Sequence, residues 1–314
     1  MKVLVCGAGG FIGGHLANYL YNKGYEVKTC DIKPNPWQKI PNFTKADLRD
    51  PKQCRKLVKN IDWIFQLAAN MGGIGYITRV KADVMHDNVI MNANMLKASV
   101  EAGVERIFFS SSACVYPTFL QDDPNKTVYL KEEDAIPASP DTPYGWEKLF
   151  SEFMYQAFEE DYGIKVRIAR FHNVYGPYGE WKNGREKAPA ALCRKVAMAN
   201  DGDSIEIWGT GKQRRSFLYI DDCLEAVYRL MQSDYNKPIN IGSDRDITID
   251  QLADIIIKIS GKHLTKKYRP DMPVGVQSRN ADLTLARKVL NWEPKVTYEE
   301  GLRRLYNWIL SQLS

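Results

Sequence analysis

The chain has 314 residues, of which 44% are hydrophobic, so it can bury one large core or two smaller ones, and disordered or fibrous classes are excluded. Its 43 lysines and arginines are interleaved with 38 acidic residues, which leaves a formal net charge of +5 and no run of five like charges. This balance argues against a nucleic-acid binder but allows a local basic pocket for an anionic small molecule.

The first expected elements are a strand, a glycine-rich turn and a helix. Residues 2–6 form a short apolar run, residues 7–13 read GAGGFIG, and helical spacing of apolar residues continues to Gly24. Three glycines of this turn have the spacing GxxGxxG, a variant of the dinucleotide fingerprint, which allows a close approach to a pyrophosphate. A plain glycine-rich turn is the alternative. The expected cofactor contacts are Gly7, Gly10, Phe11, Ile12 and Gly13.

Asp31 ends a second expected strand at residues 25–31. A carboxylate at this place accepts hydrogen bonds from both ribose hydroxyls of NAD and repels the 2'-phosphate of NADP. Lys28 and Lys33 lie nearby and could accommodate that phosphate, but the acid favours NAD as the cofactor. Asp47 and Leu48 follow a third short strand and are expected near the adenine, although a turn and a core leucine would look the same.

Three further strands are expected at residues 62–69, 106–112 and 165–171, with helical stretches between them. Such βαβ units predict an α/β fold with a Rossmann-type, doubly wound parallel sheet. After Asn173 the pattern loosens, with a helix through about residues 188–200, short strands near residues 205–209 and 214–220, and two or three helices in 247–314. We therefore expect a second, smaller, discontinuous α/β domain. The predicted NAD-binding domain is residues 1–172 plus about 217–242, and the predicted nucleotide-sugar-binding domain is about 173–216 plus 243–314.

Tyr144 and Lys148 are four residues apart at the start of a helix that Pro143 is well placed to open, so their side chains share one face. An ammonium there is expected to lower the pKa of the phenol. The phenol can then remove the proton of a sugar hydroxyl while hydride leaves to nicotinamide. YxxxK alone occurs by chance in many helices. It indicates a catalytic pair here because the serines at 110–112 and the glycine turn accompany it.

These motifs together resemble the extended short-chain dehydrogenase/reductase family over the whole chain length. They comprise GxxGxxG, Asp31, LAA at 67–69, SSxxxY at 111–116 and YxxxK. The resemblance implies that NAD is contacted by Leu67, Ala68, Ala69, Tyr144 and Lys148. It also implies sugar and tyrosine contacts from Ser111 and Ser112, whereas the thiol of Cys114 departs from the serine or threonine that usually stands in this neighbourhood.

Cys114, with AANMGGIGYI at 68–77, the segment 170–195 and QRRSF at 213–217, is similar to the GDP-mannose 3,5-epimerases of that family. Their chemistry implies a transient ketone at carbon 4 of the mannose ring, with Tyr144 as base and NAD as hydride acceptor. The ketone acidifies carbons 3 and 5, and inversion there needs two acid-base groups on opposite faces of the ring. The resemblance assigns these roles to Cys114 as thiolate base and Lys187 as proton donor. From the residues alone, a buried thiol and an exposed lysine remain the alternatives.

The same resemblance implies that GDP-mannose or a related GDP-hexose is the substrate. The anionic diphosphate calls for cations, which three of the expected contacts supply. For each cation, a solvated surface charge is the alternative. The expected substrate contacts are Gly72, Gly73, Ser112, Ala113, Cys114, Asn173, Glu186, Lys187, Ala188, Lys195, Gln213, Arg215 and Arg279. The neighbouring His172 can be interpreted simply as a partly buried histidine whose hydrogen bonds are made within the protein.

Two other functions stay open. GDP-4-keto-6-deoxymannose 3,5-epimerase/reductases of the fucose pathway resemble this chain at MGGI and SSACVYP, but they normally use a histidine as partner acid and prefer NADPH, whereas this chain offers Lys187 and Asp31. A non-catalytic NAD-binding scaffold would usually have lost Tyr144 or Lys148, and both are present.

The six cysteines form no CxxC pair and no zinc-type cluster, so no metal site is expected and reduced thiols are the simplest interpretation. The first strand starts at Lys2, leaving no room for a signal segment, and no apolar run of about 18 residues could span a bilayer. We therefore expect a cytoplasmic protein that binds neither membrane nor nucleic acid. By resemblance, it should form a homodimer through helices at about 84–102 and 144–162.

Overall fold

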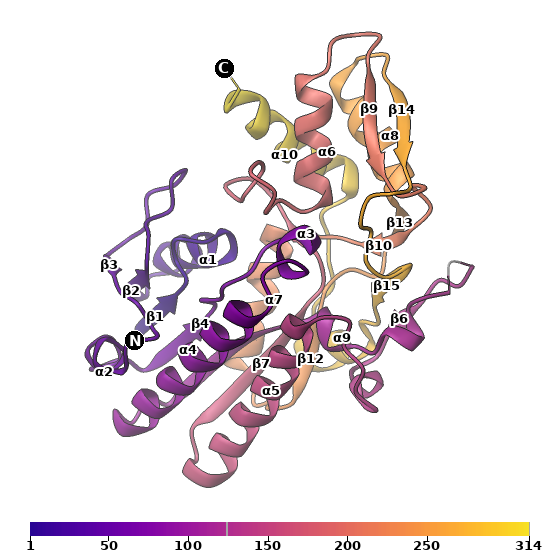
Figure 1. Ribbon diagram of the computed structural model, residues 1–314. Coiled ribbons are helices and arrows are strands. Elements are labelled where there is room, and N and C mark those ends of the chain that lie inside the picture. Colours follow the sequence, from indigo (N-terminus) through magenta and orange to yellow (C-terminus); the bar gives the residue numbers. More distant parts are fainter. Residues whose placement is uncertain (124, 314) are drawn as a thin grey trace.

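The computed structural model describes residues 1–123 and 125–313. Its framework is a sheet of seven parallel strands in the order β12-β7-β5-β4-β1-β2-β3 (Figure 1). Chain order runs outward from β1 on one side and then from β4 on the other, so the predicted doubly wound α/β sheet is confirmed. The strands are β1 (Lys2–Cys6), β2 (Glu26–Asp31), β3 (Phe43–Lys45), β4 (Trp63–Gln66), β5 (Arg106–Ser112), β7 (Lys165–Phe171) and β12 (Pro238–Ile241).

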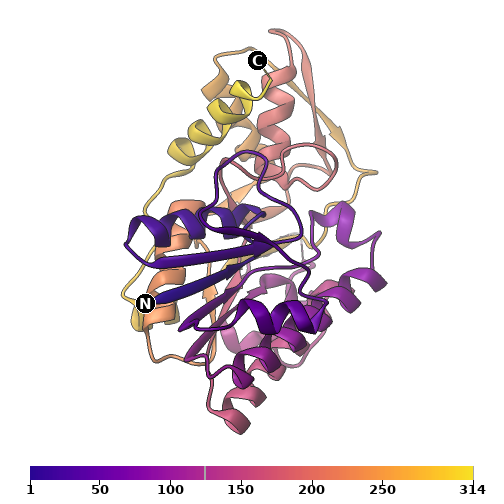
Figure 2. The ribbon, with the colours of Figure 1, turned by 90° about the vertical axis from the view of Figure 1, so that its left-hand side faces the viewer.

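Both faces of this sheet are covered by helices, which is why its central strands carry buried apolar residues on both faces. Alternate residues point to opposite faces: Leu4 and Ile64 belong to one buried cluster and Val3 and Phe65 to the other. The first face packs against α2 (Pro51–Leu57), α4 (Ala82–Glu101) and α5 (Pro143–Tyr162). The second packs against α1 (Phe11–Asn22), α7 (Ile220–Gln232) and α9 (Thr284–Leu290). Figure 2 shows the strands between these two layers.

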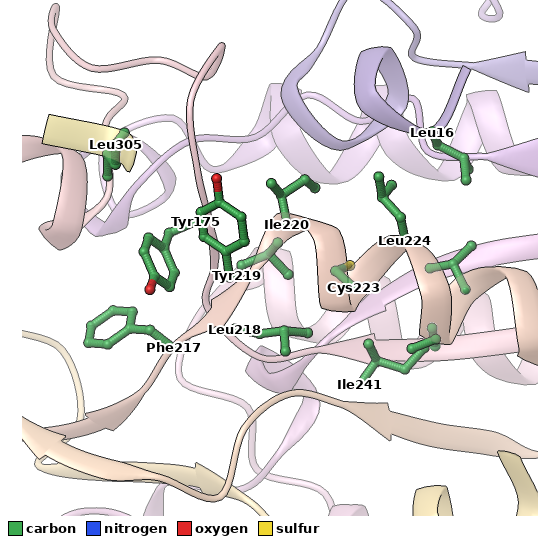
Figure 3. Packing of buried hydrophobic residues seen from close by; sticks show 14 of the residues in the cluster. Leu16, Tyr175, Phe217, Leu218, Tyr219, Ile220, Cys223, Leu224, Ile241 and Leu305 are labelled. Carbon is green, nitrogen blue, oxygen red and sulfur yellow. The ribbon is translucent and has the colours of Figure 1, made fainter. Parts of the chain in front are cut away.

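Helix α7 joins the sheet to the rest of the molecule through one continuous core. In Figure 3, Leu224 of this helix lies between Leu16 of α1 and Ile241 of β12. The same cluster continues through Phe217 to Leu305 of α10 (Tyr298–Ser311). The elements that carry the cleft described below are therefore packed on the sheet rather than hinged on a thin connection.

In the described part of the chain, the remaining elements are three helices, three small sheets and four short helical turns. Helices α6 (Ala188–Met198), α8 (Ile249–Ser260) and α10 pack on one another, in the upper part of Figure 1. Beside them, β9 (Ser204–Trp208) pairs with β14 (Thr265–Arg269), and β8 (Val174–Tyr175) pairs with β11 (Leu218–Tyr219). A four-stranded sheet has the order β13-β10-β15-β6, from β13 (Asp246–Thr248), β10 (Arg214–Ser216), β15 (Ser278–Ala281) and β6 (Tyr129–Leu130). Short helical turns are α3 (Ile74–Ile77), η1 (Ala113–Val115), η2 (Thr118–Leu120) and η3 (Glu132–Ala135).

Most expected elements are present, with two informative differences. The expected strand at 214–220 is split into β10 and β11, and α7 begins at Ile220. The expected strand at 62–69 ends at Gln66, because the next three residues leave the sheet and line the cleft. The domain boundaries remain a prediction, and β6, from the segment expected to bind NAD, lies in the four-stranded sheet. Within the described residues, no helix has the length and apolar character needed to cross a membrane.

Candidate active site

One cleft of about 850 Å³ lies at the carboxyl ends of the large sheet, where open α/β sheets bind ligands. Every residue that the sequence proposes for cofactor, substrate or catalysis lines it, although the chain brings them from positions 7 to 279. The placement is therefore as expected, and the individual roles remain predictions. The cleft combines the glycine turn, the end of β5, the start of α5, the segment before α6, and strands β10 and β15.

The glycine turn fits a dinucleotide pyrophosphate. Gly7 has a φ of 79°, and a Cβ there would lie 2.6 Å from the backbone nitrogen of Ala68, so only glycine permits this packing. Helix α1 starts directly after Gly10, without a side-chain cap and without an acid in its first turn. Its first amides are thus left for an anion, which the positive end of the helix also favours.

Asp31, which is expected to bind the ribose, lines the cleft beside the glycine turn. Its Oδ2 accepts a hydrogen bond from the amide of Gly9 at 3.0 Å, and burial raises the pKa of this carboxyl. The two lysines that could serve a 2'-phosphate have partners elsewhere: Lys28 donates to the carbonyl of Lys59, and Lys33 lies 3.9 Å from Glu180. The carboxylate therefore dominates this position, as NAD requires.

The expected adenine end lies beyond Asp31. Asp47 lines the cleft and forms an ion pair with Arg49 at 2.7 Å, and Arg49 also reaches Asp87. Leu48 is buried at the same edge, so it serves the core as well as the cleft wall. The interpretation of Leu48 as a core leucine is confirmed, and its contact with the adenine remains a prediction.

Tyr144 and Lys148 lie on one buried turn of α5. The helix begins as expected, with Pro143 in its first turn and the hydroxyl of Thr142 accepting from the amide of Gly145 at 3.2 Å. The ammonium of Lys148 lies 5.6 Å from the centroid of the Tyr144 ring. Burial lowers the pKa of Lys148.

The expected lowering of the phenol's pKa is wrong for this arrangement. Burial raises the pKa of Tyr144 well above 10, and the nearby Cys114 and Glu147 act in the same direction, while a hydrogen bond with Ser112 opposes them. The physical reason is that Lys148 has a carboxylate of its own: Oε1 of Glu147 lies 3.8 Å from its Nζ. A single lysine with a counter-ion does not offset complete burial of a phenol.

Cys114 lies in η1, at the end of β5. The hydroxyl of Ser112 accepts from the amide of Cys114 at 3.2 Å, and the thiol sulfur accepts from Nη1 of Arg279 at 3.4 Å. Cys114 is partly exposed to the cleft, whereas the other five cysteines are buried. An accessible sulfur beside a fixed cation is the environment typical of reactive cysteines.

Arg279 is itself held by residues that the sequence did not reveal. Its Nε donates to Oε1 of Gln121 at 2.5 Å, and its Nη2, which has no hydrogen-bond partner, lies 3.8 Å from the carboxylate of Asp141. Arg215 stands opposite Arg279 on the paired strands β10 and β15. Burial, and then the charge of Arg279, lower the pKa of Arg215 to about 9. Two crowded guanidinium groups favour an anionic ligand.

Lys187 is partly buried at the N-cap position of α6, so the alternative of a fully exposed lysine at a helix start is wrong. Burial lowers the pKa of Lys187, and it lies close enough for a Cys114 thiolate to oppose that effect. The preceding segment is fixed against the MGG loop: the amide of Gly73 donates to the carbonyl of Arg185 at 3.1 Å, and a Cβ on Gly73 would lie 2.7 Å from the carbonyl oxygen of Glu186. Ala188 then begins α6.

The remaining expected contacts have partners of their own. Lys195 donates to the carbonyl of Glu206 at 2.8 Å, Gln213 donates to the carbonyl of Trp208 at 2.8 Å, and Asn173 donates to the carbonyl of Ser216 at 3.0 Å. One carboxylate oxygen of Glu186 accepts from Arg194 at 3.1 Å, while the other is buried without a partner. That oxygen has capacity left for a hydroxyl donor.

Two side chains near the cleft are engaged elsewhere. The hydroxyl of Ser111 donates to Glu152 at 2.5 Å, so its expected role as a sugar or tyrosine contact is wrong. His172 is completely buried and bonded to Asn240 at 2.9 Å, and burial lowers its pKa to about 3. A histidine that stays neutral in this way is a structural residue and no proton donor.

Comparisons with known proteins agree with this geometry. The profile described as "NAD dependent epimerase/dehydratase family" matches residues 3–242. Over 317 aligned positions the chain is 43% identical to GDP-mannose 3,5-epimerase 1 of Oryza sativa subsp. indica, covering 100% of this chain and 82% of that protein. It is 42% identical to the GDP-mannose 3,5-epimerase of Arabidopsis thaliana, covering 100% and 83%. A solved UDP-glucose 4-epimerase of Thermotoga maritima, with UDP-glucose, matches with a TM-score of 0.88 and 28% identity, covering 100% of both chains.

Proposed function

The chain belongs to the NAD dependent epimerase/dehydratase family, and we propose that it is a GDP-mannose 3,5-epimerase that converts GDP-mannose to GDP-L-galactose. Its cofactor is NAD. The observation that carries this proposal is the presence of Cys114 and Lys187 in the same cleft as Tyr144 and Lys148. An enzyme that inverts only carbon 4 has no need of that second acid-base pair.

The glycine turn and Asp31 would hold NAD⁺, which would supply a hydride acceptor for carbon 4 and a positive charge. Tyr144, hydrogen-bonded with Ser112, takes the proton of the 4-hydroxyl and gives it back. Because burial holds the pKa of this phenol high in the chain by itself, the cationic cofactor and Lys148 are both needed to ionise it.

Inversion at carbons 3 and 5 falls to Cys114 and Lys187. The thiolate of Cys114, next to Arg279, removes a proton beside the carbonyl, and the ammonium of Lys187 supplies one from the other face. Burial lowers the pKa of Lys187, which makes the ammonium a better proton donor than a surface lysine. The unpartnered oxygen of Glu186 accepts a hydrogen bond from the sugar.

The nucleotide part of the substrate lies along the cations of the cleft. We place the diphosphate near Arg215 and Arg279 and the rest of the nucleotide toward Lys195 and Gln213, with Asn173, Gly72 and Gly73 bordering the hexose. Related GDP-hexoses fit the same description. The fucose-pathway alternative is not favoured, because the cleft offers Lys187 and Asp31 where those enzymes normally use a histidine and NADPH. A non-catalytic scaffold is not favoured either, because Tyr144 and Lys148 both line the cleft.

We further propose a homodimer formed through α4 and α5. Trp146, Phe150 and Phe153 lie on one face of α5 and are 46%, 53% and 57% exposed. Replacing Phe150 and Phe153 with glutamate should give a monomer by light scattering. We also propose the two-domain division given above and a cytoplasmic location, with which the six unpaired cysteines are compatible.

The test is hydrogen exchange in heavy water. Wild-type protein with NAD and GDP-mannose should incorporate deuterium at carbons 3 and 5 and form GDP-L-galactose without net NADH, as followed by NMR. UDP-glucose and GDP-4-keto-6-deoxymannose in parallel reactions separate the alternatives. Absence of exchange at both carbons of GDP-mannose, with NAD bound, would sink the proposal.

A further inference from the structure

Glu147 is a buried carboxylate that the mechanism above does not use. It precedes Lys148 on α5, its side chain is 0% exposed, and its Oε1 lies 3.8 Å from the Lys148 ammonium. We propose that Glu147 is a positioning residue: its charge keeps Lys148 protonated beside Tyr144, and its hydrogen bonds tie that lysine to the 70–76 loop. The proposal rests on the proposed function, because it assigns Lys148 to the hydride-transfer step.

The first support is the charge environment. Lys148 is buried against the ring of Phe109, 4.8 Å from its centroid, where an ammonium without a counter-ion is strongly disfavoured. The other buried carboxylate of this helix, Glu152, is already paired with Arg170 of β7 at 2.7 Å. Within the described part of the chain, the ion-pair partner of Lys148 is Glu147.

The second support is a hydrogen-bonded chain from Glu147 to the loop. Nδ2 of Asn88, on α4, donates to Oε1 of Glu147 at 2.8 Å and to the carbonyl of Asn70 at 3.2 Å, while the amide of Asn70 donates to Oδ1 of Asn88 at 2.6 Å. The hydroxyl of Tyr76 donates to Oδ1 of Asn70 at 2.8 Å. Asn70 and Tyr76 thus close the loop that holds Gly72 and Gly73 at the cleft.

This series of hydrogen bonds ends beside Lys187, the proposed proton donor. The guanidinium of Arg185 lies 4.0 Å from the centroid of the Tyr76 ring, and Lys187 follows two residues later. The same loop bonds that segment through the amide of Gly73. Glu147 therefore anchors one end of a polar connection between the lysine of the hydride step and the lysine of the proton step.

The negative charge of Glu147, rather than the shape of its side chain, stabilises the protonated form of Lys148. A glutamine could still accept from Asn88 through its carbonyl oxygen, so an uncharged residue would satisfy the loop connection. The remaining groups around the pair come from three other positions of the fold besides α5. Helix α5 contributes Tyr144, Ser151, Glu152 and Tyr155, η1 contributes Cys114, and α4 and β5 contribute the neutral Asn88 and Phe109. Loss of the carboxylate is therefore a loss of negative charge with little other change.

The expected consequence can be worked out for both reacting groups. Glu147 raises the pKa of Lys148 against the effect of burial, and it adds to the effect of burial in raising the pKa of Tyr144. The hydride step needs ionised Tyr144 and charged Lys148. The ionisation of Tyr144 therefore sets the acid limb of the pH profile, and the deprotonation of Lys148 sets the alkaline limb. Without Glu147 both limbs should move to lower pH.

The experiment measures NADH formation in the first turnover with GDP-mannose, followed by absorbance across pH, because neither Cys114 nor Lys187 acts in that step. Glu147→Gln should shift both limbs down by about one pH unit. Glu147→Asp, which keeps the charge, should hold the wild-type limbs, and Glu160→Gln, which removes an exposed carboxylate from the same helix, should match wild type. If the Glu147→Gln profile overlays that of wild type, the proposal is overturned.

A second measurement does not depend on turnover. Glu147→Gln, Lys148→Met and the double variant are compared by thermal unfolding with NAD absent. An ion pair predicts that the double variant loses less than the sum of the two single losses in Tm. Additive losses would contradict the pair even if the enzyme is active. Coupled losses without any NADH formed by wild type would instead count against the proposed function alone.

Discussion

The thiol sulfur of Cys114 accepts a hydrogen bond from Nη1 of Arg279 at 3.4 Å, across 165 positions of sequence. This contact joins a residue at the end of the large sheet to one on a strand of the four-stranded sheet. The proposed base of the double epimerisation therefore receives its cation from the second half of the chain. Its reactivity depends on how the two halves pack.

Arg279→Gln should slow alkylation of Cys114 by iodoacetamide about tenfold at neutral pH, since it removes a charge-assisted hydrogen bond to the thiolate. The other five cysteines are buried, so mass spectrometry should find a single adduct on the folded protein. Arg279→Lys keeps the charge, so its alkylation rate should lie between the rates of wild type and Arg279→Gln. Equal rates for all three proteins would show that the guanidinium does not activate the sulfur.

Cys114→Ala should lower deuterium incorporation at carbons 3 and 5 by at least about 100-fold, the usual contribution of a general base. NAD affinity should stay at the wild-type value, because Cys114 lies away from the glycine turn. NMR of the sugar and a titration of NAD measure the two quantities. Normal exchange in this variant would make the thiol a structural residue.

Exchange at carbon 5 should fall on the alkaline side below pH 10.5. Burial lowers the pKa of Lys187 from that value, and only its ammonium can donate a proton. Lys187→Met should lose the exchange at every pH while still forming NADH in the first turnover. An alkaline limb unchanged by this substitution would assign the limb to another group.

Asp31→Asn should reduce the preference for NAD over NADP by about tenfold or more, because the carboxylate that repels the 2'-phosphate is gone and Lys33 lies nearby. Fluorescence titration with both cofactors gives the ratio. A ratio that does not change would mean that selectivity is set elsewhere in the cleft.

Stability should fall on acidification through His172. Burial depresses its pKa to about 3, so the stabilisation is complete above the unfolded value of 6.5 and is lost as pH falls toward the folded value. Between about pH 7 and pH 5 this group should remove about 2 kcal/mol of unfolding free energy. Urea denaturation of wild type and His172→Gln measures the difference. Equal losses of unfolding free energy in wild type and His172→Gln between these pH values would contradict the assignment to His172.

The fold was predictable because its signals are local. The strands at 2–6, 106–112 and 165–171 begin and end as expected, since each contains a short stretch of apolar residues bounded by helical segments. The helix of Tyr144 and Lys148 was equally clear from Pro143. By contrast, the strand expected at 214–220 is broken by Phe217, whose side chain joins the core, and this is a tertiary effect.

The site was predictable in its residues but not in its electrostatics. Resemblance identified Cys114, Lys187 and Arg279, and all three line the cleft. Nothing in the sequence indicated that Gln121 and Asp141 hold Arg279, or that Glu147 compensates Lys148, because these contacts depend on how the chain packs. The prediction of a lowered pKa for Tyr144 was wrong for the same reason, since the four-residue spacing from Lys148 does not indicate how deeply the phenol is buried.

The strand β15 lies between β10 and β6, so its partners come from residues 129–130 and 214–216. During synthesis, β15 at residues 278–281 emerges after both of them. A chain that ends before residue 278 therefore contains all seven strands of the large sheet and still lacks the cation beside its thiol. The thiol of Cys114 would then gain its activating cation only late in translation, after both members of the acid-base pair have been synthesised.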